Sequence, residues 1–203
     1  MEEYQNQSET VFEIKNLDFF FGRKKVIDNL SFTLKKGTIH GILGDNGAGK
    51  TTLFNLIFGT LQSPTLSPIN RYNIAYLETD TYFYPYMTGQ EYLELISQKN
   101  TNNVSEWNTI FGLPLNEYAH NYSTGMQKKL ALLGILLLNK EIIILDEPFN
   151  GLDLKTCEVI NYILQRLKQV NKTIILSSHI LETVIQNADE ISYMEQGKII
   201  KSF

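Results

Sequence analysis

Apolar and polar side chains alternate in two segments near the N-terminus, from Phe12 to Lys15 and from Leu30 to Lys35. A period of two residues is typical of a strand with one buried face. The first part of the chain is therefore expected to be antiparallel β-structure, after which Lys36-Gly37 turns it into a further strand.

Unbroken apolar runs follow at Ile39–Leu43, Ile142–Leu145 and Thr173–Leu176. Short runs of this kind are typical of parallel strands buried on both faces. Apolar residues at helical spacing follow two of these runs, namely Leu53, Leu56 and Ile57, and then Ile160, Ile163, Leu164 and Leu167. Residues 88–138 also have a mostly helical pattern, and residues 193–203 predict a terminal hairpin around Gln196-Gly197. The whole pattern predicts an α/β fold with a mostly parallel sheet.

Composition narrows the class of protein. The chain has 203 residues, of which 43% are hydrophobic and 20% charged, as expected for one soluble globular domain. The net charge of −4 argues against a large nucleic-acid footprint, so no nucleic-acid partner is expected. The basic groups at residues 23–25, Lys35-Lys36 and Lys128-Lys129 are interpreted as solvated faces. The single cysteine, Cys157, excludes an internal disulfide and a thiolate metal cluster.

The sequence has no recognisable targeting signal and no expected membrane segment. The acidic start, Met1–Gln5, is unlike a secretory leader. The longest apolar run, Leu130–Leu138, is too short to span a bilayer. If the protein works at a membrane, we expect a partner to hold it there.

Residues Gly44–Thr51 fit the phosphate-binding pattern G-x-x-x-x-G-K-[ST], between an expected strand and an expected helix. In such a loop, Gly44, Gly47 and Gly49 are expected to adopt positive φ, so that backbone N–H groups point inward at a phosphate. Lys50 supplies a full charge to the β- and γ-phosphates, and the Thr51 hydroxyl can ligate Mg²⁺. The nucleotide-binding residues predicted here are Gly44, Asp45, Asn46, Gly47, Ala48, Gly49, Lys50, Thr51 and Thr52.

A second group of candidates lies where later strands end. Asp146 and Glu147 follow the Ile142–Leu145 run, at the carboxyl edge where parallel sheets bind ligands. Asp146 is predicted to hold Mg²⁺ opposite Thr51, and Glu147 to act as general base or to orient the attacking water. His179 follows another strand at the same edge and is predicted to contact the γ-phosphate. Asp153 has two open interpretations, a helix N-cap and a subunit contact.

Taken together, these residues resemble the ATP-binding cassette ATPases, the nucleotide-binding subunits of ABC transporters, from about Val11 to Phe203. Gly44–Thr51 resembles the Walker A motif, Ile142–Glu147 the Walker B motif with its catalytic glutamate, and Asn150–Asp153 the D-loop. His179 resembles the switch histidine. Residues 122–127 resemble a divergent signature motif, in which Ser123, Thr124 and Gly125 would contact nucleotide held by a second subunit. Phe21 resembles the aromatic residue that stacks on adenine, although Phe19 or Phe20 could serve.

The resemblance implies ATP and Mg²⁺ as cofactors, and a head-to-tail dimer that ATP closes and hydrolysis reopens. The partner copy would be identical or a related ATPase subunit, and an integral membrane permease would hold the pair at the cytoplasmic face of the cell membrane. It also implies a single ABC ATPase domain over residues 1–203. Within it, about 1–38 and 60–78 would form the antiparallel β subdomain, 39–59 and 139–203 the ATPase core, and 79–138 the helical signature subdomain.

Three departures from the family pattern stand out. Thr124 replaces a signature glycine, and Thr79 stands where the family has the glutamine that contacts Mg²⁺, which makes Thr79 a weak metal candidate. The segment from Gly59 to Ile74 is about a dozen residues shorter than in the family. A hairpin of the antiparallel subdomain is therefore expected to be missing.

The aromatic stretch Tyr82–Met87 follows the Thr79 position. Aromatic residues and methionine are enriched in interface cores, so we hypothesise that at least two of these side chains are exposed and receive a helix of the permease. The alternative is that they pack inside the helical subdomain.

Two other functions stay open besides the transporter subunit. One is a soluble ABC-type ATPase of a non-transport assembly. The other is a regulatory ATP binder without hydrolysis, which the altered Thr79 position motivates and which Glu147 argues against.

Overall fold

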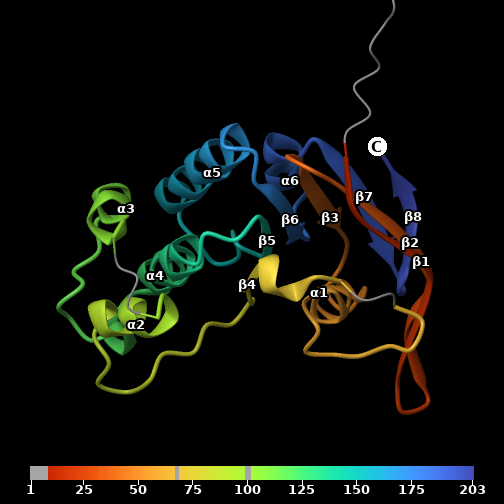
Figure 1. Cartoon of the computed structure of the whole chain (residues 1–203), viewed down its shortest axis with the longest axis horizontal. Coiled ribbons are helices and arrows are strands. Elements are labelled where there is room, and N and C mark those ends of the chain that lie inside the picture. Colours follow the sequence, from red (N-terminus) through yellow and green to blue (C-terminus); the bar gives the residue numbers. More distant parts are fainter. Residues whose placement is uncertain (1–8, 67–68, 99–101) are drawn as a thin grey trace, which may run out of the picture.

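The computed structural model describes residues 9–66, 69–98 and 102–203. The acidic start, Met1–Gln5, and two residues of the shortened segment from Gly59 to Ile74 lie outside these ranges. A two-stranded sheet, a six-stranded sheet and helices on both sides of the larger sheet make up the described fold (Figure 1). This arrangement confirms the predicted α/β class.

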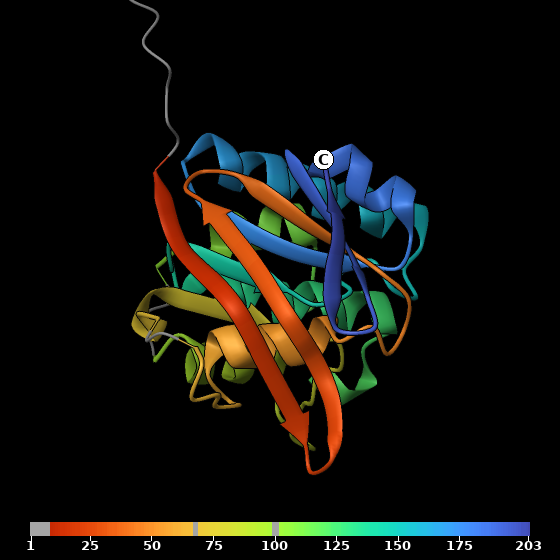
Figure 2. The same ribbon diagram turned by 90° about the vertical axis from the view of Figure 1, so that its right-hand side faces the viewer.

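The N-terminal hairpin consists of β1 (Thr10–Phe21) and β2 (Lys24–Lys35), which pair antiparallel. Its apolar positions are buried on one side, as the two-residue period predicts, and Ile14, Leu30 and Leu34 are almost completely covered. Figure 2 shows the hairpin running diagonally in front of the larger sheet.

The larger sheet has the strand order β4-β5-β6-β3-β7-β8. Its parallel members are β3 (Ile39–Leu43), β4 (Ile74–Leu77), β5 (Ile142–Leu145), β6 (Thr173–Ser178) and β7 (Glu190–Glu195). The last strand, β8 (Lys198–Ser202), returns antiparallel to β7 through Gln196 and Gly197, both at positive φ, which confirms the predicted hairpin.

The two faces of the sheet bury two different sets of side chains. Ile142 and Ile144 pack with the β1–β2 hairpin and α1 (Lys50–Phe58), whereas Ile143 and Leu145 pack with the remaining helices. Those helices are α2 (Gly89–Ile96), α3 (Val104–Phe111), α4 (Thr124–Leu137), α5 (Leu154–Gln169) and α6 (Leu181–Asn187). Burial on both faces explains why the central strands have no polar alternation.

One predicted boundary needs correction. Residues 60–78 were assigned to the antiparallel subdomain, but β4 pairs in parallel with β5, so Ile74–Leu77 belong to the six-stranded sheet. The apolar run in this segment has only four residues, which is too short to predict a buried strand from the sequence. In Figure 1, α2, α3 and α4 gather at the end of the molecule opposite the β1–β2 hairpin, and they account for the helical pattern predicted over residues 88–138.

Candidate functional site

Three neighbouring strands bring the candidate residues to one edge of the sheet. In the order β5-β6-β3, the carboxyl ends lead into Asp146-Glu147, into His179 and into the loop that starts at Gly44. Because the strands are parallel, these three ends lie side by side. Residues that are up to about 135 positions apart in sequence therefore share one site.

The loop before α1 has the backbone that a phosphate requires. Gly47 and Gly49 have φ of 85° and 110°, values that other residues rarely adopt, and Gly49 stands in the N-cap position of α1. No side chain of the described residues caps α1, so the first N–H groups of the helix remain available to an anion. The loop thus fits a nucleotide phosphate.

Gly44 corrects the sequence interpretation, because it is absent from the residues at positive φ. A Cβ atom at Gly44 would lie 2.3 Å from the carbonyl oxygen of Met194. Glycine is therefore required here because β7 approaches closely, not because of a left-handed backbone.

Lys50 begins α1 and is buried. Its Nζ donates to the carbonyl oxygen of Gly44 at 2.6 Å and of Asp45 at 3.2 Å. The same Nζ lies 3.2 Å from Oε1 of Glu147, an ion pair without hydrogen-bond geometry. These contacts hold the ammonium inside the loop, where a phosphate would meet it.

Asp146 is completely buried and is held by hydroxyl groups from three strands or helices. Thr51 donates to its Oδ2 at 2.6 Å, and Ser177 donates to its Oδ1 at 2.5 Å. The hydroxyl of Tyr76 on β4 donates to Oδ2 at 3.4 Å. Burial and the Asp146 charge together raise the pKa of Tyr76, so that it remains a donor. Thr51 and Asp146 are therefore in direct contact, and their Mg²⁺ role stays a prediction.

Glu147 stands in an uncommon backbone conformation, with φ of 49°. Its N–H donates to Ser177 Oγ at 2.9 Å, and its Oε2 lies 2.9 Å from Nδ1 of His179. Lys50 and His179 thus approach different oxygens of one carboxylate. A carboxylate fixed from two sides is suited to orient a water or to accept its proton.

A cavity of about 480 Å³ opens over these groups. The described residues that line it are Lys24, Val26, Asn46, Gly47, Gly49, Lys50, Thr51, Thr52, Thr79, Glu147 and Asn150. Phe21 is not among them; it is half exposed and packs edge-on against Phe19, with ring centroids 5.0 Å apart. Its adenine role stays a prediction.

A family model described as "ABC transporter" matches residues 27–150. An uncharacterized ABC transporter ATP-binding protein of Methanocaldococcus jannaschii is 33% identical over 199 residues, which cover 93% of this chain and 75% of that protein. The chain belongs to the ABC transporter family. It is an ATP-binding ATPase subunit of this family.

Other ABC relatives agree with this membership. The zinc import ATP-binding protein of Rickettsia conorii is 34% identical over 89% of this chain and 81% of its own length. The bacitracin transport ATP-binding protein of Bacillus licheniformis is 30% identical over 94% of this chain and 69% of its own length. Among solved structures, an ATP-binding subunit of an ABC transporter superposes with a TM-score of 0.87 at 24% identity, over 94% of this chain and 88% of that one. That likeness supports the fold.

The ABC signature region lies at the start of α4. Ser123 is exposed and accepts a bond from the N–H of Met126 at 3.3 Å, so it is a helix N-cap, while Thr124 is exposed in the first turn. Gly125 has no positive φ, and a Cβ there would make only ordinary contact with Thr156. Asp153 caps α5 by accepting from the N–H of Thr156 at 2.7 Å, which confirms its capping interpretation.

Sequence reasoning missed several residues of this ABC site. Ser177 and Tyr76 both bond Asp146, and Lys24 lines the cavity. Ser177 lies near the end of the strand that leads into His179, and this position could have predicted that it belongs to the site. The prediction that Lys128 belongs to a solvated face is wrong, because its side chain is buried.

The aromatic stretch after Thr79 divides between core and surface. Phe83 is buried, whereas Tyr82, Tyr84 and Tyr86 are 72%, 56% and 75% exposed. The expected exposure of at least two side chains is confirmed.

Among the described residues, no helix has the length and apolar character to cross a membrane, and no group of three or more His, Cys, Asp or Glu side chains is placed to hold a metal.

Proposed function

We propose that this chain hydrolyses ATP to drive transport through a separate membrane permease, with two ATPase subunits closing head-to-tail around two nucleotides. The observation that carries this proposal is the Glu147 carboxylate, which Lys50 and His179 approach from two sides. Lys50 and Glu147 both line the cavity. A site that only stored nucleotide would need the phosphate loop and the lysine, but not a fixed carboxylate beside them.

Each site residue has a separate task in this proposal. Lys50 and the backbone from Gly44 to Thr52 neutralise and orient the phosphates of ATP. Glu147 orients the attacking water and takes its proton, while His179 holds the carboxylate in place and reaches toward the γ-phosphate. Phe21 stacks on the adenine ring.

The donors at the sheet edge fit Mg²⁺. Thr51 and Asp146 offer a hydroxyl and a carboxylate, the hard oxygen ligands that this ion prefers. Thr79 lines the same cavity and is a weaker candidate, because its side chain is short. When bound, the ion would neutralise charge that develops on the phosphate oxygens.

The other half of each site would come from the second subunit. Ser123, Thr124 and Gly125 form the N-terminal end of α4, where backbone N–H groups and the helix dipole favour an anion. In the closed dimer this end would contact the γ-phosphate held by the opposite subunit. The exposure of Ser123 and Thr124 in the single chain supports the arrangement.

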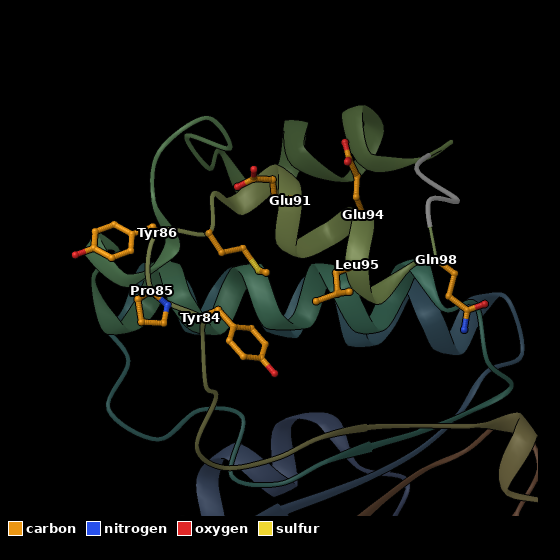
Figure 3. Close-up of a pocket in the computed structure, with 8 residues that line it drawn as sticks. Tyr84, Pro85, Tyr86, Glu91, Glu94, Leu95 and Gln98 are labelled. Carbon is orange, nitrogen blue, oxygen red and sulfur yellow. The ribbon is translucent and has the colours of Figure 1, made fainter.

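The permease is proposed to dock where the exposed tyrosines border α2. A groove of about 620 Å³ lies here. Figure 3 shows Tyr84, Pro85 and Tyr86 along one side of it and Leu95 on α2. Glu91 and Glu94 line the same groove. Apolar walls with an acidic border fit an amphipathic helix that carries a basic residue. The chain would then act at the cytoplasmic face of the membrane, held there by this contact.

Steady-state ATP turnover with Mg²⁺ tests the enzymatic part. The wild-type chain is expected to turn over ATP, Lys50→Ala to lose ATP binding or turnover, and Glu147→Gln to bind ATP without turnover and to form a dimer on size exclusion. Lys155→Ala, on the exposed side of α5, serves as the matched control. Turnover equal to wild type in Lys50→Ala contradicts the proposal.

Affinity purification from detergent-solubilised membranes tests the permease. An integral membrane protein should be recovered with the wild-type chain and lost in the double variant Tyr84→Ala and Tyr86→Ala. Recovery of a soluble assembly alone would favour the non-transport ATPase. Absence of turnover in the purified membrane complex would favour the regulatory ATP binder.

A further inference from the structure

The buried charged side chains of the described residues form a small set. Excluding histidine, they are Lys50, Lys128, Asp146 and Glu147. Three of these belong to the nucleotide site described above. Lys128, on the second turn of α4, is the fourth, and only 6% of its surface is exposed.

The Lys128 ammonium reaches from α4 to the loop that follows β4. Its Nζ donates to the main-chain carbonyl oxygen of Thr79 at 2.6 Å. The charges of Asp80, Asp146 and Glu147 act favourably on it. Removing an ammonium from water is costly, so a lysine persists in such a place only with partners of this kind.

The loop held by Lys128 joins two surfaces that carry function. At one end Thr79 lines the nucleotide cavity, and at the other end Tyr84–Met87 line the groove at α2. Between them Phe83 packs on Tyr92, with ring centroids 4.8 Å apart. Thr88 then caps α2 by accepting from the N–H of Glu91. The loop is therefore anchored at its start, middle and end.

We propose that Lys128 is a positioning residue for ATP hydrolysis, which fixes the Thr79 end of this loop against the nucleotide cavity. Because the bond goes to a carbonyl oxygen, it does not depend on the short Thr79 side chain. Lys128 lies on α4, the helix that Ser123 caps, so its bond to Thr79 would carry a displacement of α4 directly to the cavity wall. The proposal rests on the proposed ATP hydrolysis.

Kinetics on the full chain test this role. Lys128→Met keeps the length of the side chain and removes its donor, and it is expected to lower kcat about tenfold or more with KM for ATP within about twofold. Lys128→Arg, which retains charge and donors, should recover at least half of the turnover. Lys129→Met is the control, because Lys129 lies on the same helix and no hydrogen bond or ion pair joins its side chain to any described residue. Wild-type turnover in Lys128→Met would overturn the proposal.

A structural measurement separates this inference from the proposed function. Amide hydrogen exchange over residues 78–88 should accelerate about tenfold in Lys128→Met and stay unchanged in Lys129→Met. Unchanged exchange in Lys128→Met overturns the inference about Lys128, whether or not the wild-type chain turns over ATP. Absence of turnover in the wild-type chain counts against the proposed ATP hydrolysis instead. Because the Thr79 carbonyl loses its donor, Lys128→Met is expected to lower the melting temperature by only a few degrees while it lowers kcat about tenfold or more. Equal losses of melting temperature and turnover in both Lys128 variants would indicate a structural role and overturn the proposal.

Discussion

Nδ1 of His179 lies 2.9 Å from Oε2 of Glu147, across the ends of two adjacent strands. The other carboxylate oxygen of Glu147 faces Lys50 at 3.2 Å. The carboxylate is thus held between two nitrogens, and its backbone has a positive φ that costs conformational energy. Such a costly placement is typical of a functional site, and it makes the orientation of Glu147 sensitive to its neighbours.

Replacing His179 tests that dependence. His179→Ala should lower kcat about a hundredfold, because the carboxylate loses the group that orients it, while KM for ATP changes little. His179→Gln can still donate a hydrogen bond to Glu147 and should retain more activity than His179→Ala. Steady-state turnover at saturating Mg²⁺ is the measurement. His120→Ala, at an exposed histidine outside the site, is the control, and equal turnover in His179→Ala and wild type would contradict the interpretation.

Ser177 should connect stability with metal binding. Its hydroxyl donates to Asp146 and accepts from the N–H of Glu147, and the residue is completely buried. Ser177→Ala should therefore lower the free energy of unfolding by about 1–3 kcal/mol and raise the Mg²⁺ concentration needed for half-maximal turnover. Urea unfolding and a Mg²⁺ titration measure the two effects.

Ser192→Ala is the matched control for Ser177. Ser192 is also buried and bonds His40 at 2.9 Å, away from the nucleotide cavity. Its replacement should reduce stability without changing the Mg²⁺ requirement. The same Mg²⁺ dependence in Ser177→Ala and wild type would remove Ser177 from the site.

The sequence predicted this sheet edge because its signals are local. The apolar run Ile142–Leu145 predicts a buried strand, and the residues that follow must then lie at the edge. Gly47 and Gly49 follow in the same way from the loop pattern. These predictions need only the local sequence and the knowledge that the neighbouring strands are parallel.

The remaining features depend on contacts between segments that are distant in sequence. Gly44 is needed because Met194 approaches it, and the buried Lys128 finds its hydrogen-bond acceptor in the carbonyl of Thr79, on a different part of the chain. Ile74–Leu77 form a core strand because β5 pairs with them. A lysine beside another lysine on a helix indicates a solvated face unless the opposing surface is known.

Gly125 separates folding of the single chain from formation of the dimer. Gly125→Ala should leave the melting temperature unchanged or slightly higher, since alanine favours a helix and its Cβ would contact Thr156 at an ordinary 3.4 Å. If α4 receives the partner's nucleotide, the added methyl group should weaken the ATP-dependent dimer. Size exclusion of Glu147→Gln with and without Gly125→Ala measures this effect. An undiminished dimer would exclude close packing at Gly125.

His40 predicts how stability responds to acid. It is buried on β3, and burial lowers its pKa to about 4, more than the nearby Glu190 raises it, while Lys35 lowers it further. In the unfolded chain the pKa is 6.5. Between these two pKa values the unfolded state binds a proton that the folded state does not bind. The free energy of unfolding is therefore highest above pH 6.5 and falls as the pH drops toward 4, by at most about 3 kcal/mol. His40→Gln should flatten this dependence in urea unfolding between pH 7.5 and 4.5, and His120→Gln should retain it. An identical slope in His40→Gln and wild type would assign the acid sensitivity to other groups.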